Sequence, residues 1–175
     1  MVTPLEQVYH FCPRCGAGVA MIDNRIVTCA ACALTLFVNT AAAAGVIIRD
    51  VHDRILFVVR QHEPDKGKLG LPGGFVEYDE TAEESARREV KEEVNLDLAA
   101  LHYLCSFPNH YEYKGICYRT LDLFYEARVT DVAAMRGNEE VAGIVWLAVP
   151  EIELEQIAFA SVRRAVARSL NSHGG

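Results

Sequence analysis

The sequence predicts an α/β fold, in which one mixed α/β domain follows a small cysteine-rich segment. Strand-like apolar runs separated by polar turns occupy the middle of the chain, and two later segments have helical periodicity. Four cysteines form two Cys-x-x-Cys pairs near the start. A chain of 175 residues is long enough for about one ordinary domain with a small appendage.

Composition and charge exclude several classes of protein. A hydrophobic fraction of 51% can bury a sizeable core, which excludes disorder and collagen-like repeats. The chain has 17 basic and 24 acidic residues, a net charge of −7, which argues against a general nucleic-acid binder. Its longest small or apolar run, residues 41–48, is far short of the roughly 20 residues of a spanning helix. Residues 1–10 lack the features of a secretory signal, so we expect a cytoplasmic protein with no membrane partner.

The paired cysteines predict a structural Zn²⁺ site. Two such knuckles can each offer two thiolates to one tetrahedral ion, here Cys12, Cys15, Cys29 and Cys32. Residues 19–22 and 26–28 read as a short hairpin around 23–24. Two disulfides or a redox-active pair are the alternatives, although cytosolic chains rarely keep disulfides. Cys105 and Cys117 lie in apolar, strand-like runs and are expected in the core.

We expect two domains, a zinc ribbon over residues 1–36 and a mixed α/β domain over 37–175. Residues 61–70 are polar and contain Gly and Pro, so they read as a loop. The expected strands after the cysteines are 37–49, 54–60, 71–76, 101–107, 116–128 and 143–149.

Two helices are expected, over residues 81–94 and 157–170. Thr81 is a suitable N-cap with Glu84 three residues on, the arrangement of a capping box. Asn95 tolerates left-handed geometry and suits the C-terminal stop. The last helix is amphipathic, with its small and apolar residues at helical spacing.

The first helix carries an unusual concentration of carboxylates. Glu89, Glu92 and Glu93 lie within roughly 60° of one another on one helix face, where like charges repel. A hard divalent cation would turn that repulsion into coordination. The alternative is an ordinary solvated face, which does not explain the rigid turn Pro72-Gly73-Gly74 just before the helix.

The turn and the helix together resemble the Nudix box. Its spacing runs from Gly74 through Glu80 to the helix residues Arg88, Glu89, Val90, Glu92, Glu93 and the later Leu96. One position departs, since Asn95 stands where the family usually has glycine. The chain therefore resembles a Nudix hydrolase from residue 40 to about residue 170. The resemblance implies a Nudix-type α/β/α sandwich with a mixed β-sheet.

The resemblance also implies metal-dependent cleavage of a pyrophosphate in a nucleoside diphosphate linked to another moiety, with Mg²⁺ or Mn²⁺ as the catalytic cofactor. Glu89 and Glu93 would be the principal metal ligands. Glu92 would be a further ligand or a water partner, and the Gly73 carbonyl an additional contact. Arg88 and Glu80 would orient the carboxylates.

A carboxylate would take the proton of the attacking water, either Glu89 or a later acid. Glu140 stands where several family members place an extra acidic ligand or base, with Glu139 as its competitor. An ordinary loop carboxylate is the alternative for Glu140. The expected catalytic residues are therefore Glu89, Glu92, Arg88 and Glu140.

A four-cysteine ribbon ahead of this domain resembles the NADH pyrophosphatase subgroup, which favours a dinucleotide such as NADH or NAD⁺ as substrate. The subgroup's Ser-Gln-Pro-Trp-Pro-Phe-Pro segment is absent from the sequence. In the corresponding stretch Phe107, Tyr111 and Tyr118 could stack on a base, and Arg60 could meet a phosphate. A strand with ordinary alternating aromatics is the alternative.

Other functions stay open at this stage. The substrate could be ADP-ribose, another nucleoside diphosphate sugar or a nucleoside triphosphate. The chain could also be a non-catalytic nucleotide-sensing module whose ribbon contacts a partner. Because Nudix hydrolases are often homodimers, a second copy is a candidate partner.

Overall fold

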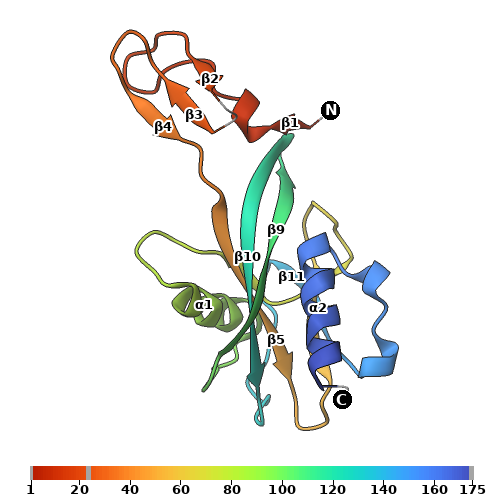
Figure 1. The fold of residues 1–175 in the computed structure, drawn as a ribbon. Coiled ribbons are helices and arrows are strands. Elements are labelled where there is room, and N and C mark those ends of the chain that lie inside the picture. The colour runs from red at the N-terminus through yellow and green to blue at the C-terminus, as the bar shows by residue number, and fades with distance from the viewer. Residues whose placement is uncertain (1, 23–24, 174–175) are drawn as a thin grey trace. The chain divides into compact units, whose positions relative to one another are not determined.

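The computed structural model describes residues 2–22 and 25–173, and of residues 21, 22 and 173 only the backbone. The chain forms two compact units, Met1–Ala41 with His110–Thr120, and Ala42–Asn109 with Leu121–Gly175 (Figure 1). The expected domain boundary between residues 36 and 37 lies inside a strand of the first unit, and it stays a prediction.

The first unit contains a small antiparallel sheet of three strands in the order β2-β3-β4. Their bounds are Ala20–Ile22, Ile26–Thr28 and Thr35–Phe37. The predicted hairpin forms between β2 and β3, while its turn at 23–24 lies outside the described residues. Ahead of this sheet are β1 (Thr3–Pro4), which pairs in parallel with Ile116 and Cys117, and the 3-10 helix η1 (Leu5–Gln7).

A larger sheet provides the framework of the second unit. Its path continues from β10 through β5 and β6 to β11, and β9, β8 and β7 pair with β10, β5 and β6. The strands are β5 (Ala41–Arg49), β6 (Ile55–Arg60), β7 (Leu69–Gly70), β8 (Gly73–Phe75), β9 (His102–Tyr113), β10 (Ile116–Arg128) and β11 (Val141–Leu147).

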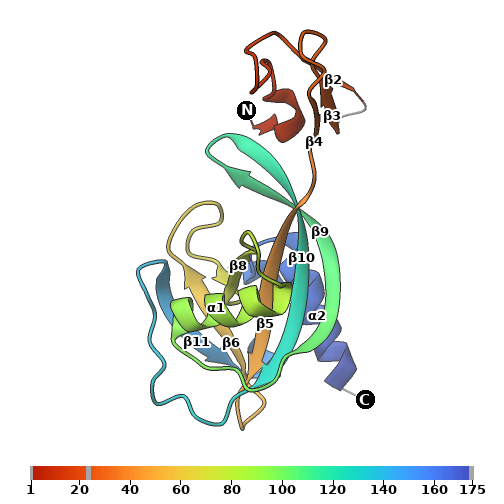
Figure 2. The same ribbon diagram turned by 90° about the vertical axis from the view of Figure 1, so that its left-hand side faces the viewer.

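Two helices cover opposite faces of this sheet, α1 (Ala82–Val94) and α2 (Ala160–His173), as Figures 1 and 2 show. The alternation of side chains along each strand supplies both cores. On β5, Val46 and Ile48 pack in the cluster that includes α1, whereas Ile47 packs in the cluster that includes α2. The predicted α/β/α sandwich with a mixed sheet is confirmed. The described residues contain no helix that is long and apolar enough to cross a membrane.

Several elements differ from the predicted ones. The predicted loop over 61–70 ends in β7, which pairs with β6, and the predicted strand over 71–76 is reduced to β8. The predicted strand over 143–149 is β11, which starts at Val141 because that residue pairs with Arg60 and ends before the 3-10 helix that begins at Val149.

The predicted strand over 37–49 is divided between β4 and β5, so Phe37 belongs to the small sheet. β9 extends to Tyr113 because Lys114 and Gly115, both at positive φ, form a tight turn into β10. The last helix begins at Ala160 rather than at 157, because Ile157 forms a parallel bridge with Leu69. Two short 3-10 helices, η2 (Val149–Glu151) and η3 (Leu154–Gln156), precede it.

Candidate active site and metal centre

Helix α1 begins and ends as the sequence predicts. The Thr81 side chain accepts a hydrogen bond from the Glu84 backbone, and the Glu84 side chain accepts one from the Thr81 backbone, which completes a capping box. At the other end Asn95 takes the left-handed conformation, with φ +54° and ψ +39°. Both ends of the helix are therefore fixed by its caps, which fixes the set of residues that form its charged face.

Two glycines let strand β8 lie close to its neighbours, Gly73 to the backbone of strand β5 and Gly74 to the Glu89 carboxylate of α1. Gly73 has φ +148°, and a Cβ there would lie 2.1 Å from the backbone oxygen of Ala44. A Cβ on Gly74 would lie 2.4 Å from Glu89 Oε1. Both distances are shorter than any real contact. Position 73 requires glycine because the neighbouring atom is backbone and φ is positive, whereas a side chain at position 74 would displace the Glu89 carboxylate.

Glu93 is the carboxylate most strongly perturbed by its surroundings. Its Oε2 accepts a hydrogen bond of 2.9 Å from the backbone N–H of Gly73. Burial raises the pKa of Glu93 to about 8, and repulsion from Glu89 and Glu140 adds to the effect of burial. A nearby cation would offset the cost of ionising this group.

Arg88 ties three carboxylates together. Its guanidinium donates to both oxygens of Glu80, at 2.7 and 3.1 Å, and to Glu89 Oε1 at 2.8 Å and Glu92 Oε2 at 3.2 Å. The bond from Arg88, followed by one from the Glu77 backbone, lowers the pKa of Glu80 to about 2. Burial raises the pKa of Glu89 although Arg88 opposes the shift. Arg88 thus fixes the rotamers of the carboxylates around it.

The donor set suits a hard divalent cation. The carboxylates supply oxygen ligands, which Mg²⁺ and Mn²⁺ prefer, and the Glu89 side chain is only 14% exposed. Their oxygens are not gathered as tightly as the cysteine sulfurs described below, because Glu89 turns to Arg88 and Glu93 turns to Gly73. Glu92 is the most exposed of the three helix glutamates, at 56%.

Glu140 lies close enough to the helix glutamates to act on them electrostatically. Its charge raises the pKa of both Glu89 and Glu93. The Glu140 side chain is exposed, and its backbone N–H donates to Asn138 Oδ1 at 2.9 Å. These contacts favour Glu140 over Glu139 as the later acid, and its role stays a prediction.

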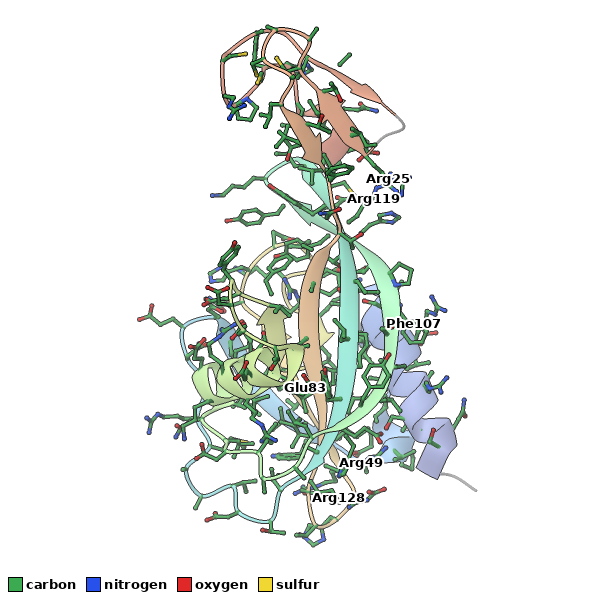
Figure 3. The ribbon with its side chains drawn as sticks, turned by 60° about the vertical axis from the view of Figure 1, so that its left-hand side comes forward. Arg25, Arg49, Glu83, Phe107, Arg119 and Arg128 are labelled. Atoms are coloured by element: carbon green, nitrogen blue, oxygen red, sulfur yellow. The ribbon has the colours of Figure 1, made fainter. Side chains whose placement is uncertain are left out.

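Of the residues expected to contact substrate, Arg60 acts on a helix carboxylate, since its charge works to lower the pKa of Glu93 against the effect of burial. Arg60 lies with its guanidinium 4.7 Å from the centre of the Phe159 ring and donates to the Pro64 carbonyl. Phe107 packs against the core on the α2 side of the sheet (Figure 3). The Arg164 guanidinium lies over its ring, 4.0 Å from the ring centre. Tyr111 and Tyr118 belong to the first compact unit. Their roles in binding stay predictions.

The four predicted zinc ligands do come together in the first unit. Within the part of the chain that the structure describes, Cys12, Cys15, Cys29 and Cys32 form the group whose metal-binding atoms all lie within 4.8 Å of one another. The sulfurs of Cys12 and Cys32 are 3.6 Å apart, and those of Cys15 and Cys29 are 3.5 Å apart. A disulfide needs about 2.05 Å, so the disulfide alternative is wrong for this structure. Sulfurs bound to one tetrahedral Zn²⁺ at about 2.3 Å would be separated by a similar distance.

Both knuckles have the same backbone geometry, which explains how two short segments aim four sulfurs at one point. In each, the amide four residues on donates to the first cysteine's carbonyl, from Gly16 to Cys12 and from Ala33 to Cys29, both at 2.9 Å. Gly16 and Ala33 both have positive φ. Of the two other cysteines, Cys105 is buried in the core as predicted, and Cys117 is half-buried.

Comparison with known proteins decides the family. The family model described as NUDIX domain matches residues 39–169, about three quarters of the chain. This chain belongs to the Nudix family. A solved Nudix hydrolase from Nitrosomonas europaea covers 94% of this chain and 93% of its own, with a TM-score of 0.70 and 23% identity. That likeness concerns the Nudix fold alone.

Curated relatives match parts of the chain. An ADP-ribose pyrophosphatase from Methanocaldococcus jannaschii is 47% identical over 62 residues, which are 35% of this chain and 36% of the relative. An NAD-capped RNA hydrolase NudC from Vibrio atlanticus is 28% identical over 105 residues, which are 59% of this chain and 38% of the relative. The matched stretches span well under half the length of these curated relatives.

Proposed function

We propose that this Nudix protein is a metal-dependent pyrophosphohydrolase that cleaves a nucleoside diphosphate linked to another moiety, with a dinucleotide such as NADH or NAD⁺ as substrate. The observation that carries the proposal is the carboxylate cluster on α1. Glu93 is held by Gly73, Glu89 lies against Gly74, and Arg88 holds Glu89 in place. A site for nucleotide sensing alone would not need carboxylates arranged at this cost in repulsion.

Each residue has a definite task in this proposal. Glu89 and Glu93 would hold Mg²⁺ or Mn²⁺, with Glu92 and the Gly73 carbonyl as further contacts. When bound, divalent ions neutralise diphosphate charge and make water a better nucleophile. Glu140 or Glu89 would accept the proton of the attacking water. Arg88, which donates to both carboxylate oxygens of Glu80, would keep Glu89 and Glu92 oriented.

The substrate class rests on two supports. The cysteine knuckles precede the Nudix domain in this chain, the arrangement that resembles NADH pyrophosphatases, and one relative is named as an enzyme of NAD-capped RNA. The ADP-ribose pyrophosphatase relative favours ADP-ribose as the second candidate. NADH, NAD⁺ and ADP-ribose all contain an adenosine diphosphate joined to a second ribose, so one site could accept that common part.

The test is product formation from NADH, NAD⁺, ADP-ribose and common nucleoside triphosphates, each with Mg²⁺ and with Mn²⁺. We expect two mononucleotides from NADH. Glu93→Gln should abolish most turnover, because one ligand charge is lost from the cluster. Glu83→Gln is the matched control on the same helix, since Glu83 binds the Tyr125 hydroxyl away from the cluster and should keep full turnover.

Either of two results would contradict the proposal. Near-native turnover in Glu93→Gln would show that the carboxylate cluster is not the catalytic site. Inactivity of the folded protein on every substrate with both metals would favour the nucleotide-sensing module. The cytoplasmic location and a homodimer remain predictions beside this proposal.

A further inference from the structure

The departure from the Nudix box at residue 95 places a hydrogen-bond donor at the end of α1. A glycine would also suit the left-handed turn at this position. The asparagine side chain adds a contact that glycine cannot make, because its Nδ2 donates to the carbonyl of Ala134 at 2.7 Å. Asn95 therefore joins the end of the helix to a segment 39 residues later in the chain.

That segment, residues 130–140, lies on the last turn of α1, and we call it the strap. Arg136 N–H donates to the carbonyl of Val94 at 3.1 Å, and Asn138 N–H donates to the carbonyl of Glu93 at 3.2 Å. The last carbonyls of a helix have no partner within the helix. The strap supplies partners for two of them, and the Asn95 amide is a third connection between the same two parts.

The strap ends at Glu140, two residues after the Asn138 that binds the Glu93 carbonyl, and the charge of Glu140 acts on Glu89 and Glu93. Asn138 Oδ1 accepts a hydrogen bond from the Glu140 backbone at 2.9 Å, and the Glu140 carbonyl accepts one of 3.4 Å from Gln61 N–H. Glu140 is thus attached on two sides, to the strap through Asn138 and to the residue after β6 through Gln61, and the next residue, Val141, pairs with Arg60. A strap displaced from α1 would leave Glu140 with only its attachment to the sheet, and so with less restraint near Glu89 and Glu93.

We infer that Asn95 is a positioning residue, whose side-chain amide holds the strap on α1 and thereby restrains Glu140, from the strap side, near Glu89 and Glu93. The effect on turnover rests on the proposed function. The attachment of the strap does not, because it depends only on contacts within the second compact unit.

The first experiment replaces the amide without disturbing the turn. Asn95→Gly keeps the left-handed conformation and removes the donor. Amide hydrogen exchange at Arg136 and Asn138 should become about fivefold faster, the change expected from one hydrogen bond. The value of kcat should fall by about the same factor while KM changes less than about twofold, because the group displaced acts on the reacting atoms. Asn95→Asp keeps the size of the side chain but turns oxygens toward the Ala134 carbonyl, so it should behave like Asn95→Gly.

A double-mutant cycle separates positioning from general destabilisation. In a Glu140→Gln background, Asn95→Gly should lower kcat little further, since the group that it positions has already lost its charge. Lys91→Met is the matched control, because it removes the ion pair between Lys91 and Asp97 at the same helix end without touching the strap. It should leave kcat and the exchange of Arg136 and Asn138 unchanged.

The outcomes are distinguishable from those for the proposed function. Unchanged exchange at Arg136 and Asn138 in both Asn95 variants would overturn the inference. Independent, multiplicative losses of kcat from Asn95→Gly and Glu140→Gln would overturn its link to Glu140. Faster exchange in a protein whose parent hydrolyses none of the substrates would support the attachment and contradict the proposed function.

Discussion

Gly74 is the residue at which a single added methyl group should test the position of Glu89. The carboxylate of Glu89 occupies the space that a methyl group on residue 74 would need, at 2.4 Å from its Cβ. In Gly74→Ala the flexible Glu89 side chain must move, whereas the apolar core is not involved. We expect turnover to fall about a hundredfold with little change in melting temperature, as misplaced catalytic groups commonly cause. Gly143→Ala is the control, since its nearest contact would be an ordinary 3.7 Å. Equal turnover in the two variants would mean that Glu89 is not needed.

Glu93 should make the stability of the protein depend on pH when Mg²⁺ and Mn²⁺ are absent. Burial raises its pKa from 4.5 to about 8, so the folded protein binds more protons than the unfolded chain between these values. Stability should therefore be highest near the lower value and decrease as pH rises toward the higher one. Melting temperatures of protein dialysed free of both ions would measure the decrease, and Glu93→Gln should lack most of it. A parallel decrease in Glu93→Gln would assign the effect to other groups.

The motif residues could be predicted because their relations are local. Gly74, Glu80 and the α1 glutamates are close in sequence, so helix geometry alone places the charged side chains on one face. The attachment of the strap could not be predicted, since it depends on a contact between Asn95 and Ala134, 39 residues apart. The sequence marked Asn95 as a departure from the motif but gave no sign of its partner.

At the scale of elements, α1 was predicted with its correct ends because the signals for both lie within the helix and its caps. The start of α2 was not, because Ile157 fits the helical pattern of apolar residues and yet pairs with Leu69. Long-range pairing overrode a local pattern there. β9 was predicted too short for a related reason, since polar residues after Phe107 hide the continuation of a strand that pairs with β10.

The capping box makes a prediction for α1 as an element. Thr81→Ala removes the acceptor for the Glu84 amide and should cost about 1 kcal/mol of folding stability. For a chain of this size that corresponds to a melting temperature lower by about 2–4 °C. Thr81→Ser keeps the hydroxyl and should restore most of the loss. A melting temperature equal to that of the parent in Thr81→Ala would show that packing alone determines where the helix starts.

The whole molecule joins two units that are stabilised by different means. The second unit has two hydrophobic clusters on the two faces of its sheet. In the first unit, the strands β1 to β4 are only two or three residues long, and the ends of β9 and β10 over residues 110–120 complete the unit. Its exposed side chains include Phe11 and Phe37. A unit with so little buried apolar surface needs another source of stability, and the four cysteines can supply it through Zn²⁺.

Removal of zinc should therefore destabilise the first unit and leave the second unit folded. Cys29→Ser takes one ligand from the cluster, so we expect lower zinc content by elemental analysis and rapid amide exchange over residues 2–41. Exchange in the core of α1 and α2 should stay slow, because those helices pack on the second unit's own clusters. Cys117→Ser changes a cysteine outside the cluster and should keep both the zinc and the slow exchange. Unchanged zinc content in Cys29→Ser would contradict the four-cysteine site, and global loss of protection would mean that the second unit depends on the first for its fold.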